Sequence, residues 1–152
     1  LIKKYIMHKI LILLSLSVFL FSCNENEPTK ENVTEPSIQQ NRVQVIDFHT
    51  THRCETCLTI EKKTMETIND HFKNEFDNGE TTFQSINVDE KENEAIAEEY
   101  EAYGTSLFIT VVKDGKSEKI DLTDFAFTNA MAEDDSFKTG LTEQLNDALN
   151  KL

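Results

Sequence analysis

A run of apolar residues from Val43 to Phe48 is followed, after a short polar loop, by two cysteines, Cys54 and Cys57. The apolar run is nearly continuous and rich in β-branched residues, which is typical of a strand buried on both faces of a sheet. From Cys54 to Phe76, apolar residues recur at three- and four-residue steps, which predicts a helix with one apolar face. The sequence therefore predicts a strand and a helix with a dithiol at the corner between them. The residues expected on the buried face of this helix are Leu58, Met65, Ile68, Phe72 and Phe76.

Downstream segments alternate between strand-like and helix-like patterns. The further predicted elements are strands at 81–89, 107–112 and 117–122, and helices at 91–103, 123–131 and 134–152. A strand-helix-strand start predicts parallel pairing, and Asp114-Gly115 predicts a tight hairpin turn between two later strands. Asn78-Gly79 is a plausible end for the first helix. The predicted order is β-α-β-α-β-β-α, an α/β fold with a central mixed sheet flanked by helices.

Residues 1–22 have the composition of an export signal. Lys3, Lys4 and Lys9 provide a positive start, and an apolar run follows from Ile10 to Phe21. This run is shorter than the roughly 20 residues that a bilayer-spanning helix needs. The sequence begins with Leu1, and the segment from Met7 onward is by itself a compact signal, so translation could start at either residue.

The apolar run ends in Leu20-Phe21-Ser22-Cys23. This motif resembles the lipobox of bacterial lipoproteins, and the resemblance implies that Cys23 becomes a mature N-terminus carrying acyl chains such as palmitate. Several acyl chains anchor a protein stably to a membrane, whereas a single chain does not. The alternative is that Cys23 is only the last residue of a signal peptide cut elsewhere. The lipoprotein interpretation predicts a bacterial cell-envelope protein that is lipid-anchored and faces the periplasm or the cell surface.

The predicted division of the chain has three parts. Residues 1–22 form the signal peptide, residues 23–42 form a lipidated N-terminus and a flexible linker, and residues 43–152 form one globular domain. The linker contains both prolines of the chain, Pro28 and Pro36, and almost no large apolar residues. A segment of this composition cannot bury enough apolar surface to become ordered.

The chain carries a net charge of −13, which argues against nucleic acid as a partner because its phosphates require Lys and Arg. We interpret the acidity as a solvated surface. There are three cysteines, an odd number that calls for an explanation in an exported protein. If Cys23 is lipidated, one pair is left.

The spacing of Cys54 and Cys57 suits thiol–disulfide exchange, in which one thiolate attacks and a second cysteine resolves the mixed disulfide. Cys54 lies at the predicted helix start, where unpaired backbone N–H groups favour negative charge. His52 and Arg53 add positive charge beside it, and these effects together are expected to lower the thiol pKa, although Glu55 opposes them. We therefore expect Cys54 to attack and Cys57 to resolve, with a thiol- or disulfide-bearing protein as partner.

Other roles for the same residues stay open. Thiolates and imidazoles together suit copper(I) or zinc, and His49 and His52 lie close in sequence to Cys54 and Cys57. A third possibility is a non-catalytic scaffold in which a Cys54–Cys57 disulfide only staples the helix start. Asp47 could accept a proton from Cys57, or it could lie exposed at the end of the strand. The sequence has no glycine-rich phosphate loop, so no cofactor is expected.

The predicted order, with CxxC at the start of the first helix, resembles the thioredoxin fold over residues 43–152. The matching segments are 45–48 with 54–57, and 103–104 with 113–115. The segments 48–62 and 85–93 are also similar to small envelope proteins of the family labelled nitrophenyl-compound nitroreductase subunit ArsF. No flavin or nicotinamide motif is present to support nitroreduction. The resemblance implies a thioredoxin-like domain with a redox-active CxxC.

Two features differ from the thioredoxin pattern. That family has a cis-proline facing the dithiol, which helps to hold substrate peptides and keeps metals off the thiols. Leu107 takes its place here, preceded by Ser106, and no proline follows Pro36. In addition, the interval from Asp47 to Cys54 is one residue longer than usual. The missing proline leaves both peptide exchange and metal binding to be decided by experiment.

Overall fold

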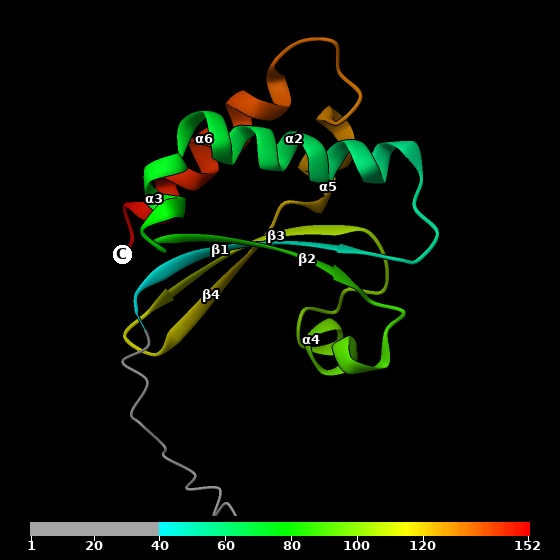
Figure 1. Ribbon diagram of the computed structural model, residues 1–152, viewed down its shortest axis with the longest axis horizontal. Helices are drawn as coiled ribbons and strands as arrows, with labels where there is room; N and C mark the ends of the chain where they lie inside the picture. The colour runs from blue at the N-terminus through cyan, green and yellow to red at the C-terminus, as the bar shows by residue number, and fades with distance from the viewer. Residues whose placement is uncertain (1–39) are drawn as a thin grey trace, which may run out of the picture. The chain divides into compact units, whose positions relative to one another are not determined.

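Four strands form one mixed sheet in the order β2-β1-β3-β4 (Figure 1). The computed structural model describes residues 40–152. The predicted signal peptide, Cys23 and nearly all of the predicted linker lie outside these residues. The strands are β1 (Arg42–His49), β2 (Thr81–Asn87), β3 (Ser106–Lys113) and β4 (Lys116–Asp121).

Helices cover both faces of the sheet. They are α2 (Glu55–His71), α3 (Lys73–Asp77), the 3-10 helix η1 (Lys91–Asn93), α4 (Glu94–Glu99), α5 (Thr123–Asn129) and α6 (Ser136–Leu149). Figure 1 shows α2, α3, α5 and α6 over one face and α4 over the other. The predicted α/β order is confirmed, with the first helix divided into α2 and α3. Within the described residues, no helix has both the length and the apolar character required to cross a membrane.

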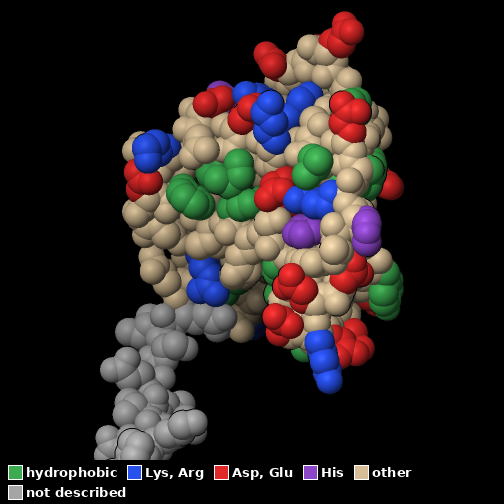
Figure 2. Space-filling view, turned by 45° about the vertical axis from the view of Figure 1, so that its right-hand side comes forward, with side chains coloured by type: hydrophobic (Ala, Val, Ile, Leu, Met, Phe, Trp, Pro, Cys, Tyr) green, Lys and Arg blue, Asp and Glu red, His purple; other side chains and the backbone are tan. Residues whose placement is uncertain are grey.

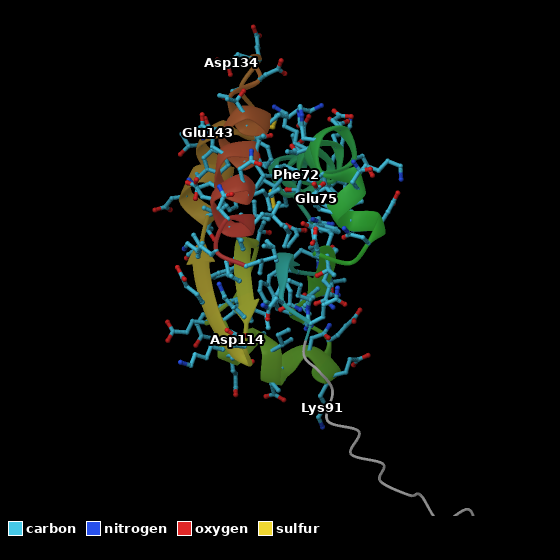
Figure 3. The ribbon with its side chains drawn as sticks, turned by 90° about the vertical axis from the view of Figure 1, so that its left-hand side faces the viewer. Phe72, Glu75, Lys91, Asp114, Asp134 and Glu143 are labelled. Atoms are coloured by element: carbon cyan, nitrogen blue, oxygen red, sulfur yellow. A yellow bond between two sulfur atoms is a disulfide. The ribbon has the colours of Figure 1, made fainter. Side chains whose placement is uncertain are left out.

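Strand β1 lies in the interior of the sheet, parallel to β2 and antiparallel to β3. Strand β4 then pairs antiparallel with β3 through the predicted hairpin. Asp114 and Gly115 have φ values of 50° and 74°, the positive values that a two-residue type I′ turn requires. Figure 3 shows Asp114 at one end of the domain and Asp134 at the other. The Asp114-Gly115 turn that the sequence predicts therefore joins β3 to β4, the strand at the edge of the sheet.

The core has two layers, one on each face of the sheet. On the α2 and α6 side, strand residues such as Val45 and Ile109 pack with Ile60, Phe137 and Leu141. On the α4 side, the rings of Phe48, Tyr100 and Phe108 pack against one another with centroids 5.2–5.9 Å apart. Alternate residues of β1 therefore face opposite layers, and this places Asp47 on the α2 side together with Val43 and Val45.

The predicted apolar stripe of the first helix is partly wrong. Leu58 is 51% exposed, whereas the buried residues of α2 are Cys57, Ile60, Thr64, Thr67 and Ile68. Thr67 Oγ1 bonds within the helix by donating to the Lys63 carbonyl at 2.7 Å, whereas the hydroxyl of Thr64 has no hydrogen-bond partner among residues 40–152. A pattern based only on apolar residues could not include these threonines. The helix also ends at His71, and the buried Phe72 joins it to α3.

Gly140 lies where α6 contacts the ring of Phe125. A Cβ atom at this position would lie 2.5 Å from Phe125 Cε2 and 2.8 Å from Cζ. Gly140→Ala is therefore expected to destabilise the protein by about 1 kcal/mol, because overpacking outweighs the gain in helix propensity. Urea unfolding followed by circular dichroism measures this change. Gly104→Ala is the control, because no atom lies within 4 Å of its Cβ position, and an equal loss there would contradict the packing argument.

Candidate functional site

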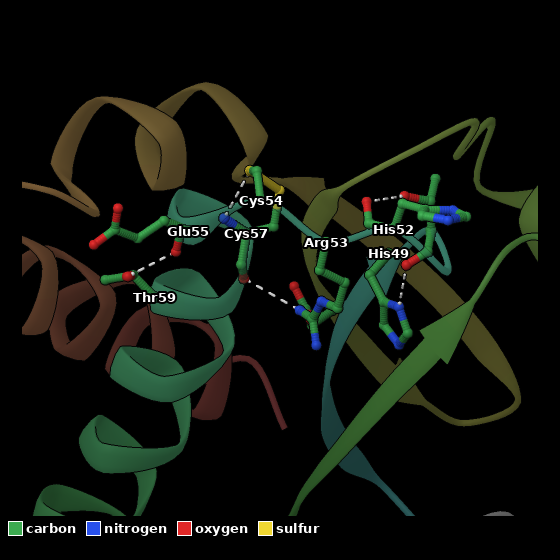
Figure 4. The surroundings of a disulfide bond; sticks show 9 residues. His49, His52, Arg53, Cys54, Glu55, Cys57 and Thr59 are labelled. Atoms are coloured by element: carbon green, nitrogen blue, oxygen red, sulfur yellow. Dashed lines mark hydrogen bonds and ion pairs between the residues drawn. A yellow bond between two sulfur atoms is a disulfide. The ribbon is translucent and has the colours of Figure 1, made fainter.

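The dithiol lies where β1 has ended and α2 begins (Figure 4). Cys54 is the N-cap residue of α2, with extended backbone angles of φ −82° and ψ 166°. Its Sγ accepts a hydrogen bond from the Cys57 amide at 3.2 Å. Cys54 and Cys57 form a disulfide, with their Cα atoms 5.1 Å apart. A negative charge on the Cys54 sulfur would thus lie against the N–H groups of the first turn, which stabilise anions.

The two cysteines differ in exposure. Cys54 is exposed to solvent, whereas Cys57 is 7% exposed and belongs to the buried face of α2. A partner's sulfur can therefore reach Cys54 directly, while Cys57 is shielded by the domain. This asymmetry is what separates an attacking thiol from a resolving thiol.

Asp47 is completely buried below the start of α2. Its neighbours in register are Leu107 on β3 and Ser85 on β2. Oδ2 accepts a hydrogen bond from Arg53 at 3.0 Å, and Oδ1 has no hydrogen-bond partner among residues 40–152. Burial raises the pKa of this carboxyl from 3.8 to about 6, against the opposing effect of the Arg53 charge. Despite the extra residue before Cys54, the chain thus places Asp47 inside the domain.

Arg53 turns its guanidinium group away from Cys54 and toward the interior. Its NH2 atom donates to Oδ2 of Asp47 at 3.0 Å and to the Cys57 carbonyl at 3.1 Å. Its NH1 atom pairs with Glu61. Figure 4 shows the guanidinium reaching the Cys57 carbonyl. Two carboxylates therefore share the positive charge that the sequence had suggested would lie beside the attacking thiol.

The hydrogen bonds of His49 and His52 are formed with Thr50, in the loop after β1, and not with the sulfur atoms. His49 Nδ1 lies 3.0 Å from the Thr50 carbonyl, and His52 is exposed, with its backbone carbonyl accepting from the Thr50 hydroxyl. Within residues 40–152, no group of three or more His, Cys, Asp or Glu side chains is arranged to hold a metal ion. The alternative in which His49 or His52 joins the two cysteines as a metal ligand stays a prediction.

Glu61 is the site residue that the sequence did not reveal. It lies four residues after Cys57, which places both on the same side of α2. Its partner Arg53 comes from the loop before the helix, so no periodic pattern links the two. The signal that could have found it is the (i, i+4) relation to Cys57.

The loop before β3 reaches the same end of the sheet as the dithiol. Ser106 lies beside Phe48, and Leu107 lies beside Asp47. Leu107 is buried, and its amide donates to the hydroxyl of Thr123 at 3.2 Å. Leu107, which the sequence aligned with the proline of the thioredoxin pattern, is therefore part of the core next to Asp47.

The sheet order, the antiparallel third strand, the helices on both faces and the CxxC at the start of α2 define a thioredoxin-like fold. Among solved structures, the chain is similar to mitochondrial thioredoxin 3 of Saccharomyces cerevisiae in its oxidised form, with 23% identity over 71% of this chain and 80% of that one (TM-score 0.43). It is also similar to Fasciola hepatica thioredoxin, with 21% identity over 70% of this chain and 81% of that one (TM-score 0.43). No protein-family model and no curated protein matches the sequence.

Acidic side chains are spread over the face of the domain shown in Figure 2 and are interrupted by smaller basic groups. This distribution agrees with the net charge of −13.

Proposed function

We propose that the protein is a thiol–disulfide oxidoreductase with Cys54 as the attacking cysteine and Cys57 as the resolving one. The observation that carries this proposal is the pairing of an exposed N-cap sulfur with a buried sulfur one turn further along α2. A disulfide that only stapled the helix would not need one sulfur in solvent.

In the reducing direction, the Cys54 thiolate attacks one sulfur of a partner's disulfide. A Cys54–partner disulfide forms, and the partner's other sulfur leaves as a thiolate that takes up a proton. Cys57 then loses its proton and attacks the Cys54 sulfur, which forms the Cys54–Cys57 disulfide and releases the second partner thiolate. The net change is that the partner's disulfide becomes two thiols while the protein's two thiols become a disulfide, and the reverse reaction oxidises a partner dithiol.

Asp47 is suited to accept the proton that Cys57 releases. It is buried on the α2 side of β1, and Oδ1 is free of hydrogen bonds from residues 40–152. A buried carboxyl whose pKa is about 6 changes charge near neutral pH, which is the range in which an acid–base group is effective.

We also propose that the domain acts at a membrane surface, held by acyl chains on Cys23 through the linker that follows. The support is the sequence alone, namely the positive start, the apolar run and Ser22-Cys23. In this proposal the partner is an envelope protein with an accessible thiol or disulfide. The segments similar to the ArsF family agree with an envelope location.

The reduction potential of the Cys54–Cys57 pair tests the proposed chemistry. The measurement uses the protein with Cys23→Ser, which removes the third cysteine, in mild detergent and metal-free glutathione or dithiothreitol buffers. We expect a potential between about −120 and −270 mV, the range of known exchange proteins, and its value will indicate the direction of exchange. A potential below about −300 mV would mark a structural disulfide and overturn the proposal.

A further inference from the structure

Three charged groups from separate segments meet beside Cys57. Asp47 comes from β1, Arg53 from the loop after it, and Glu61 from the second turn of α2. The Arg53 side chain is 14% exposed, Asp47 is 0% exposed and Glu61 is 30% exposed. One guanidinium nitrogen joins the Asp47 carboxylate to the Cys57 carbonyl. The charged group that touches the resolving cysteine is therefore also the partner of the buried acid.

We propose that Arg53 and Glu61 are positioning residues that act in opposite directions to set the pH at which Asp47 takes up a proton next to Cys57. This inference deepens the proposed exchange function and rests on it. Arg53 favours the charged carboxylate of Asp47 and ties it to the turn that carries Cys57. Glu61 pairs with the same guanidinium, and its negative charge favours the uncharged form of Asp47.

The surroundings of Asp47 contain few other charges. On its own strand, His49 favours the carboxylate weakly, and from α2 only Glu61 opposes it. Its register neighbours on the adjacent strands are the uncharged Ser85 and Leu107. Cys57 titrates only when the disulfide is reduced. In the oxidised protein, Arg53 and Glu61 are therefore the charges that dominate the response of Asp47 to pH.

The charge balance of this cluster explains why the two residues act oppositely. With Asp47 ionised, two carboxylates share one guanidinium and the cluster has a net negative charge in a mostly buried place. With Asp47 protonated, Arg53 and Glu61 balance each other. Removing Arg53 leaves a buried carboxylate unpaired and favours protonation, whereas removing the Glu61 charge leaves Arg53 entirely to Asp47.

The experiment follows the Asp47 carboxyl in the oxidised protein, where the dithiol does not titrate. Infrared spectra from pH 4 to 9 report the protonated carboxyl band, and Asp47→Asn identifies it by loss of the band. The intensity of this band plotted against pH has an inflection where Asp47 loses its proton. We expect Arg53→Met to move this inflection to higher pH by at least about one unit. Glu61→Gln is expected to move it to lower pH, and Arg53→Lys to restore part of the shift.

Controls on the same helix use an exposed ion pair. Lys62 and Glu66 lie 3.9 Å apart with side chains 74% and 42% exposed. Lys62→Met and Glu66→Gln remove the same charges as the test variants, but solvent screens them, so the inflection should not move. The pH dependence of insulin reduction should shift in the same directions as the carboxyl band in the test variants.

The outcomes separate this inference from the proposed function. Opposite shifts of the carboxyl band in Arg53→Met and Glu61→Gln support it. An inflection that stays in place in both variants, or moves the same way in both, overturns it whether or not the protein reduces disulfides. If the band shifts as expected and the unmodified protein has no exchange activity, the proposed function fails while the assignment of Arg53 and Glu61 to Asp47 stands.

Discussion

Cys54→Ser is expected to abolish disulfide exchange, with the rate of insulin reduction falling by at least about a thousandfold. A serine hydroxyl stays protonated at neutral pH and cannot form a disulfide with the partner, so neither step of the reaction can begin. The structure strengthens this expectation because Cys54 is the exposed sulfur of the pair. The assay uses the protein with Cys23→Ser in both the test and the reference sample, so that no third thiol contributes.

Cys57→Ser is the matched variant, because it removes the other sulfur of the same disulfide. It should still attack a partner through Cys54 but should fail to resolve, so mixed disulfides accumulate and are seen by mass spectrometry. The reverse pattern, with adducts trapped only in Cys54→Ser, would contradict the assignment of the two roles. Equal loss of stability in both variants, without any adduct or exchange in the reference protein, would instead indicate a structural disulfide.

Asp47→Asn is expected to stabilise the protein at pH 8 by about 3 kcal/mol, with little change near pH 4. The pKa of Asp47 rises from 3.8 to about 6 on folding, because burial disfavours the charged form. The folded state therefore holds this proton more tightly than the unfolded state does. The contribution to stability is present below pH 3.8 and is lost as pH rises through about 6. Because Asn carries no charge, Asp47→Asn avoids this loss of stability at high pH. Urea unfolding of the oxidised protein at pH 4 and pH 8 measures the change in the free energy of unfolding.

Asp89 provides a control of opposite sign. It is exposed, and its hydrogen bond with the Thr51 amide at 2.8 Å lowers its pKa. Its contribution is present above its ordinary pKa and is lost as pH falls, so Asp89→Asn should weaken the fold slightly at pH 8. A stabilisation by Asp47→Asn that is equal at pH 4 and pH 8 would show that the effect does not come from the buried charge.

Local patterns along the chain were enough to predict most of the fold. The apolar run of β1, the helical start at Cys54 and the Asp114-Gly115 turn each depend on neighbouring residues, and the structure confirms all three. The predicted stop at Asn78-Gly79 follows α3, with Gly79 at φ +83°, whereas α2 ends earlier, at His71. The dithiol could also be located, because its spacing and its place after a strand are visible in the sequence.

Burial inside the elements was harder to predict. Leu58 has the correct residue type for the core but lies on the exposed side of α2, while Thr64 and Thr67 are buried. The side that faces the sheet depends on how α2 docks on β1 and α6, and hydropathy alone does not contain that angle. The break at Phe72 likewise allows its ring to enter the core shared with Ile60 and Ile68.

The order of strands and helices, and the place of a CxxC pair at a helix start, could be predicted because periodicity, turn chemistry and motif spacing are properties of adjacent residues. The exposure of Cys54, the burial of Cys57 and the inward turn of Arg53 to Asp47 and Glu61 became visible in the folded domain. Those features depend on packing between β1, its following loop and α2. Burial and charge pairing arise from distances in space, which neighbouring residues along the chain do not specify.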